Sequence, residues 1–143
     1  MKHLLILSLA VLSLTACGNR NSKKTAENTS TETAVQAADP LTVYVYYFHG
    51  KQRCKTCIAV GNVSEKAIKD IYADNPNVKF IEVKTDDEAN APLVEKYEVT
   101  WNALIIAKGV DNVEITKQAF ASAVNNPGAL TDLIKTEVDR RLQ

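Results

Sequence analysis

The sequence predicts an α/β fold with the element order βαβαββα, in which a mixed sheet carries helices on both faces. Three observations predict it. Strand-like apolar runs alternate with stretches of helical spacing from residue 41 to residue 143. The first run, residues 41–48, is apolar at nearly every position, as expected for a strand covered on both sides. The alternating region has about a hundred residues, which suits a single domain.

The first strand is followed by a predicted helix over residues 54–74. Apolar residues recur in it at helical spacing: Val63, Ala67, Ile68, Ile71 and Tyr72. Asn75-Pro76 ends this helix, and Gly61-Asn62 predicts a kink within it. In the preceding strand, the tyrosines at positions 44, 46 and 47 are predicted to be core residues rather than a binding surface.

The elements in the middle of the domain are shorter. Residues 78–84 predict a second strand, and residues 90–97 predict a short helix with Pro92 in its first turn. Residues 104–107 predict a third strand, which residues 113–116 join as the second strand of a hairpin.

The C-terminal segment carries the clearest helix signals. Asn126 is a suitable N-cap and Pro127 a suitable first residue of a helix. The apolar residues that follow share one helical face: Leu130, Leu133, Ile134 and Val138.

The first sixteen residues have the features of an export signal. Lys2 supplies the positive charge, and residues 4–14 form an apolar stretch too short to span a bilayer. The stretch is followed by Thr15-Ala16-Cys17, which resembles the bacterial lipoprotein box. In that family the peptide before the cysteine is removed, and the cysteine carries diacylglycerol and an N-linked acyl chain such as palmitate. The alternative is an ordinary cleaved signal with a chance cysteine.

The lipoprotein interpretation predicts three parts: residues 1–16 as signal peptide, 17–40 as lipidated Cys17 and flexible tether, and 41–143 as the folded domain. The tether is polar and small, so it cannot bury enough apolar surface to fold. Its predicted reach is about 25–30 Å. The protein is then expected to be extracytoplasmic, periplasmic or in the cell envelope, and anchored in a lipid membrane, where disulfides persist.

The charge balance excludes a nucleic-acid footprint. Lys and Arg number 17 and Asp and Glu number 17, so loss of Lys2 with the signal leaves a net charge of −1. We therefore expect no nucleic-acid partner, and contact with the membrane through lipid rather than through a basic patch.

Cys54-Lys55-Thr56-Cys57 is the chemically most informative segment. Two thiols three positions apart, after a strand and at the start of a helix, predict a disulfide that opens and closes reversibly. Cys54 at the helix N-terminus is favoured as a thiolate by the helix dipole. Four nearby residues also favour an anion: His49, Lys51, Arg53 and Lys55.

The strand, the Cys-x-x-Cys motif opening a long helix, the element order and the size together resemble the thioredoxin fold over residues 41–143. The resemblance implies that Cys54 is the attacking thiol and Cys57 the resolving thiol. It also implies that the loop opposite the cysteines, with Trp101, Asn102 and Ala103, receives the substrate. No organic cofactor is expected, because the dithiol is itself the redox group.

Two features depart from ordinary thioredoxins. Residues 100–104 contain no proline, whereas thioredoxins have a cis-proline just before the third strand. Residues 41–48 contain no acid, whereas thioredoxins carry a buried Asp there. The missing proline affects the backbone that would pair with a substrate strand. The missing Asp leaves no evident base for proton transfer.

Further segments suggest a narrower resemblance: Tyr46-Tyr47-Phe48-His49-Gly50, Arg53-Cys54-Lys55-Thr56-Cys57, Tyr97-Glu98-Val99-Thr100-Trp101, Ala119-Phe120 and Asn125-Asn126-Pro127. They resemble the ArsF-type thioredoxin-like lipoprotein family, known as nitrophenyl compound nitroreductase subunits. The name of that family points to arsenic.

Three other interpretations of the cysteine pair stay open. A structural disulfide is one, although so short a loop constrains the unfolded chain little. A zinc site is another, although Cys54, Cys57 and His49 make only three of the four ligands that zinc needs. Capture of arsenite or a soft metal by the two thiols is the third.

Two neighbouring residues also have two interpretations each. His49 either acts on the Cys54 thiolate, as its ion-pair partner or as a proton shuttle, or is a loop histidine with a backbone partner. Trp101 either forms an apolar lip for a partner or packs into the core.

The sequence thus predicts a membrane-tethered thiol–disulfide oxidoreductase or electron carrier. Its expected partners are a protein disulfide as substrate and a membrane thiol-transfer protein as electron source. The alternative function is a binding module that holds arsenite or a soft metal with the same two thiols.

Overall fold

A computed structural model describes residues 39–143, so the predicted signal peptide, Cys17 and most of the predicted tether lie outside the described residues. The described part contains one four-stranded sheet in the order β2-β1-β3-β4. Its strands are β1 (Val43–His49), β2 (Val78–Lys84), β3 (Ala103–Lys108) and β4 (Asp111–Glu114). The strand β1 pairs parallel with β2 and antiparallel with β3, and β3 pairs antiparallel with β4. The predicted mixed sheet is confirmed.

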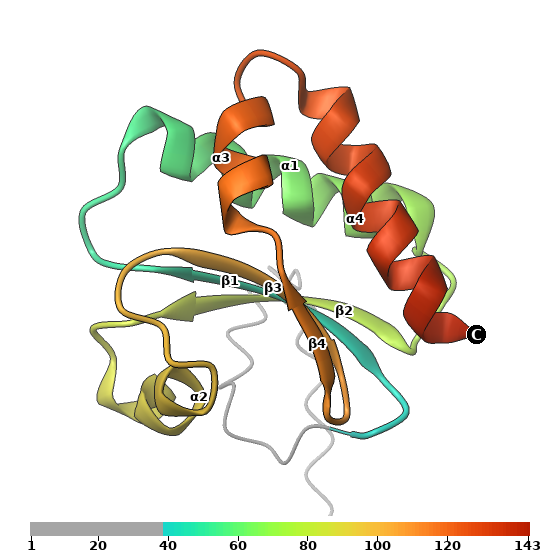
Figure 1. Cartoon of the computed structure of the whole chain (residues 1–143), viewed down its shortest axis with the longest axis horizontal. Helices are drawn as coiled ribbons and strands as arrows, with labels where there is room; N and C mark the ends of the chain where they lie inside the picture. The colour runs from blue at the N-terminus through green and yellow to red at the C-terminus, as the bar shows by residue number, and fades with distance from the viewer. Residues whose placement is uncertain (1–38) are drawn as a thin grey trace, which may run out of the picture. The chain divides into compact units, whose positions relative to one another are not determined.

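Helices cover both faces of this sheet (Figure 1). One face carries α1 (Lys55–Ile71), α3 (Thr116–Ser122) and α4 (Pro127–Leu142). The other carries α2 (Ala91–Lys96), which a 3-10 turn over Glu88–Asn90 precedes. The observed order β1α1β2α2β3β4α3α4 confirms the predicted α/β class and resembles the thioredoxin-like topology. It adds one helix, α3, that the sequence did not predict.

Alternate residues of β1 supply two separate cores, as expected for a strand buried on both faces. The larger core lies under α1, α3 and α4, with Val43, Val45 and Tyr47 as its β1 members. The smaller core lies under α2, with Tyr46 and Phe48 as its β1 members. Tyr46 and Tyr47 are therefore core residues, as predicted, whereas Tyr44 is only partly buried.

The sequence did not predict α3 because contacts with a distant strand, rather than local sequence signals, set where this helix begins. It has seven residues and no side-chain cap. Its start is fixed by β3, since Leu104 N donates to Thr116 Oγ1 over 2.9 Å and Ile115 N donates to Leu104 O over 2.9 Å. The predicted fourth strand over 113–116 consequently lies two residues too late in the sequence.

The first strand also differs from its predicted bounds of 41–48. Leu41 is 69% exposed and precedes the strand, whereas His49 is its last residue and only 4% exposed. The predicted helix over 54–74 is Lys55–Ile71, with Cys54 as its N-cap. Asn126 does cap α4, where its side chain accepts a hydrogen bond from Ala129 N.

Gly61 lies at a close packing contact, and the kink predicted there stays a prediction. The helix α1 is continuous through this position. A Cβ atom placed on Gly61 would lie 2.7 Å from Arg53 Nη2 and 3.0 Å from Tyr47 Cε1, closer than carbon atoms pack. Glycine is needed here because two side chains press against the helix backbone.

Candidate thiol–disulfide site

The cysteine pair forms a disulfide at the start of α1, with the two Cα atoms 5.0 Å apart. Cys54 is the N-cap residue in an extended conformation, and its sulfur accepts a hydrogen bond from Cys57 N over 3.1 Å. Cys54 is exposed, whereas Cys57 is 5% exposed. An external thiol can therefore reach one sulfur only, and that sulfur lies where helix N–H groups stabilise negative charge.

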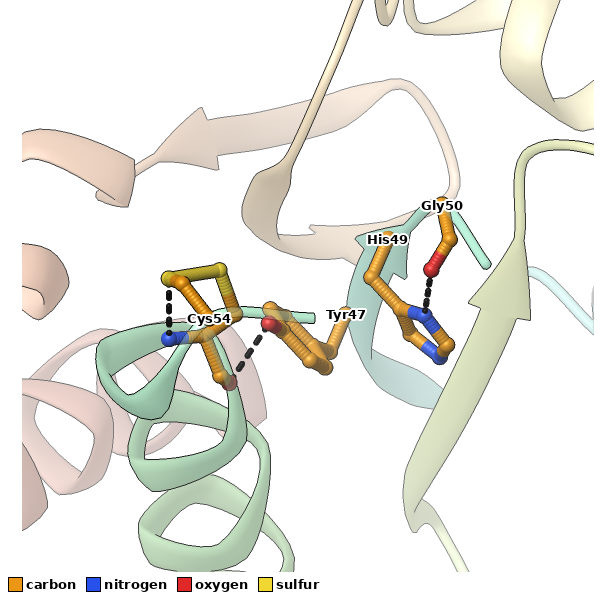
Figure 2. The surroundings of a disulfide bond; sticks show 5 residues. Tyr47, His49, Gly50 and Cys54 are labelled. Carbon is orange, nitrogen blue, oxygen red and sulfur yellow. Dashed lines mark hydrogen bonds between the residues drawn. A yellow bond between two sulfur atoms is a disulfide. The ribbon is translucent and has the colours of Figure 1, made fainter. Parts of the chain in front are cut away.

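Tyr47 in β1 contacts the first turn of α1. It is fully buried in β1, and its hydroxyl donates to the carbonyl oxygen of Cys57 over 2.6 Å (Figure 2). Burial raises the pKa of Tyr47, and the nearby Arg53 guanidinium only partly opposes this. The hydroxyl is thus a lasting hydrogen-bond donor that fixes the carbonyl of the buried cysteine.

His49 lies at the end of β1 but bonds away from the disulfide. Its Nδ1 is 2.8 Å from the Gly50 carbonyl oxygen, toward which the ring points in Figure 2. Its Nε2 is 3.0 Å from Glu82 Oε1, but off the direction of a hydrogen bond. The backbone partner agrees with the second interpretation of His49. An ion pair with the Cys54 thiolate would belong to the reduced form and stays a prediction.

Arg53, the residue before the disulfide, is held in an ion pair that the sequence did not predict. Its Nη1 donates to Glu82 Oε1 over 2.8 Å, and its guanidinium carbon lies 5.5 Å from the centre of the Tyr47 ring. The earlier expectation that Arg53 simply adds positive charge near Cys54 is therefore incomplete. A carboxylate offsets that charge.

Glu82 is the site residue that sequence reasoning missed. It comes from β2, where it stands opposite Tyr47 in the parallel register. No acid occurs in residues 41–48, so the carboxylate at this site comes from the neighbouring strand. Only the pairing of β1 with β2 reveals this, because a lone Glu in an edge strand normally faces solvent.

The loop before β3 reaches the same end of the sheet. Ala103 is buried at the start of β3 and pairs with Phe48, the residue before His49. Asn102 is half-buried and Trp101 is 78% exposed, so the interpretation of Trp101 as a core residue is wrong. Residues 39–143 contain no cis peptide bond. Whether this loop receives a substrate stays a prediction.

Two further findings concern metals and membranes. Across residues 39–143, no three His, Cys, Asp or Glu side chains converge in a way that could hold a metal ion. In the same span, no helix is both long and apolar enough to cross a membrane.

Comparisons with known proteins add little to this geometry. No family model matches the chain, and no curated protein does. One solved structure, described as "Structure of a malarial protein", is similar with a TM-score of 0.47 and 23% identity, over 68% of this chain and 98% of that one. A likeness at this level carries no functional argument. On its own sheet order and motif, the described chain has a thioredoxin-like fold with a Cys-x-x-Cys disulfide at the N-terminus of its first helix.

Proposed function

We propose that this protein is a thiol–disulfide oxidoreductase that uses Cys54 and Cys57. One observation carries the proposal: the two bonded sulfurs differ sharply in access, because Cys54 is exposed at a helix N-terminus and Cys57 is buried one turn later. A staple that served stability alone would not need one sulfur presented in this way.

In the reducing direction, the Cys54 thiolate attacks one sulfur of a partner disulfide and forms a mixed disulfide. The partner's other sulfur leaves as a thiolate and takes a proton from water. Cys57 then loses its proton and attacks the Cys54 sulfur, which releases the partner's first sulfur as a second thiolate. Two electrons pass from the dithiol to the partner, and the Cys54–Cys57 disulfide is left behind. The hydrogen bond from Tyr47 keeps the first turn of α1 in place while the sulfurs exchange.

We further propose that the protein acts outside the cytoplasm, on a protein disulfide, while anchored in a membrane through lipid on Cys17. A reducing role there needs electrons from the cytoplasm, so a membrane thiol-transfer protein is the proposed source. The signal-like segment and the Thr15-Ala16-Cys17 sequence support this part of the proposal.

The test uses the full chain, reduced and then mixed in equal amount with a small disulfide-containing protein. The unchanged chain should reduce it in a single turnover. Cys54→Ser should abolish exchange, and Cys57→Ser should accumulate a mixed disulfide visible by mass. Cys17→Ser is the matched control, since it removes a thiol without touching the pair, and it should exchange normally. Normal exchange by Cys54→Ser would sink the proposal.

Capture of arsenite or a soft metal is the second candidate, because the reduced pair would present two thiols at one turn of a helix. It accompanies the finer proposal that the chain belongs to the ArsF-type lipoproteins. Titration of the reduced chain with arsenite distinguishes the two functions. Tight one-to-one binding without any exchange against a disulfide would favour the binding module.

A further inference from the structure

Glu82 joins two basic residues on the β2 side of the disulfide. The same oxygen, Oε1, lies 2.8 Å from Arg53 Nη1 and 3.0 Å from His49 Nε2. Arg53 is the immediate neighbour of Cys54, and its guanidinium also lies against Gly61 and the Tyr47 ring. The guanidinium of the residue before Cys54 is therefore held in one position, and the charge that compensates it comes from a different strand.

This cluster is not arranged for stability alone. Arg53 Nε is buried and lacks a hydrogen-bond partner within the described chain, and His49 Nε2 faces Glu82 off the direction of a hydrogen bond. Buried polar atoms left unpaired cost stability. Gly61, which costs helix stability, leaves the space in which the Arg53 side chain lies.

The charge of the redox pair changes between its two states. The disulfide is neutral, whereas the reduced pair carries the Cys54 thiolate, so a nearby cation favours the reduced state. A carboxylate that offsets the cation favours the disulfide. Lys51 and Lys55 are exposed and have no ion-pair partner among residues 39–143, so water and salt screen their charges. Water and salt screen the half-buried Arg53 less than these two lysines.

We propose that Glu82 is a positioning residue that sets the reduction potential of the Cys54–Cys57 pair. By offsetting the charge of Arg53, it keeps the reduced pair a better electron donor than it would otherwise be. This inference rests on the proposed function, since only a pair that cycles has a potential to set.

The test measures the equilibrium between the full chain and glutathione at pH 7. In Glu82→Gln, the constant for oxidation of the protein dithiol by glutathione disulfide should fall about three- to tenfold, where tenfold equals ~30 mV for two electrons. In Arg53→Gln this constant should rise by a similar factor, because the negative charge of Glu82 then has no Arg53 cation to compensate. The double variant should return to within about twofold of the unchanged chain. Glu65→Gln is the matched control, because it removes a carboxylate from an ion pair with Lys69 in α1, at an exposed surface position.

A second readout separates charge from structure. The rate at which iodoacetamide alkylates reduced Cys54 at pH 6 should rise in Glu82→Gln, in step with a larger thiolate fraction, and fall in Arg53→Gln. Shifts of the same sign in both single variants would show a merely structural cluster and overturn the inference. The inference would also be overturned if Glu82→Gln left the equilibrium constant with glutathione unchanged while its free energy of unfolding matched that of the unchanged chain. If the unchanged chain cannot be reduced and reoxidised at all, both this inference and the proposed function fall, whereas a cycling chain with unmoved variants sinks this inference alone.

Discussion

Gly61 makes room for two side chains that pack near the first turns of α1. Arg53 Nη2 and the Tyr47 ring occupy the space that any side chain at this position would need. Alanine at this position would require the guanidinium to shift, while its Nη1 now donates to Glu82 over 2.8 Å. The absence of a side chain at Gly61 therefore leaves room for Arg53 in its present position.

Ser64 is a second small residue on the buried face of α1, and it gives a stability prediction. It is 0% exposed, and its hydroxyl has no hydrogen-bond partner among the described residues. An unpaired buried hydroxyl costs about 1–3 kcal/mol, so Ser64→Ala should stabilise the fold by about 1 kcal/mol after loss of some packing. Urea unfolding of the reduced and oxidised chain measures this.

Ser122→Ala is the control for that measurement, since the Ser122 hydroxyl donates to Gln118 O over 2.7 Å. Its removal should give no gain. A loss of stability in Ser64→Ala would mean that the hydroxyl is paired in solution, and it would contradict the prediction.

At the scale of elements, the C-terminal end of α4 is fastened to the β3–β4 hairpin. Lys108 donates to Arg141 O over 2.6 Å, and Arg141 Nε lies 3.1 Å from Asp111 Oδ2. The buried Arg141 side chain also donates to Glu137 Oε2 over 2.7 Å. The C-terminal end of α4 is thus held by ion pairs and hydrogen bonds as well as by the apolar face of the helix.

The Glu137–Arg141 pair predicts a pH dependence of stability. The hydrogen bond from Arg141 lowers the pKa of Glu137 below its ordinary value, against the opposing effect of burial. The lowered pKa means that the pair stabilises the fold above the unfolded-state pKa of about 4.3, and that this contribution is lost as pH falls through the folded-state pKa. Glu137→Gln should therefore cost about 1 kcal/mol at pH 7 and less at pH 3.

Urea unfolding at both pH values checks this expectation. Glu65→Gln serves again as control, because its exposed ion pair with Lys69 contributes little and should change stability by less than about 0.5 kcal/mol at either pH. An equal cost of Glu137→Gln at pH 7 and pH 3 would show that packing, not charge, holds the helix end.

The same two elements show how far the sequence predicts this fold. The helix α4 was predictable because its signals are local: Asn126 as cap, Pro127 as first residue, and one apolar face. The helix α3 was not, because backbone bonds to Leu104 in another strand fix its start. The candidate site divides in the same way. The cysteine pair and its place at a helix start follow from local sequence, whereas Glu82 enters only through the register of two strands.

For the whole molecule, the start of β1 and the disulfide lie at opposite ends of the sheet. The described chain enters β1 at Val43 and leaves it at His49, just before the disulfide. Seven residues of strand span roughly 20–23 Å, so the redox pair lies at the opposite end of the sheet from the predicted tether. A lipid on Cys17 would then be joined to the domain at the end of β1 that is remote from the disulfide.

This arrangement predicts a limit on reach. The predicted tether of about 23 flexible residues would typically extend some 25–30 Å, and the strand adds about 20 Å, so the pair should typically act about 50 Å from the bilayer. Deletion of residues 20–36 would leave about six linker residues with a typical extension of about 13 Å, which brings the typical distance to about 35 Å; even fully extended, these six residues and the strand would span only about 40 Å. On liposomes that carry the lipidated chain, a disulfide peptide held about 50 Å from the surface on a rigid spacer should then be reduced at least tenfold more slowly. The same peptide free in solution should be reduced at the original rate. A slower reaction with both peptides would point to damage in the domain, and an unchanged rate with the anchored peptide would show that the tether does not set the reach.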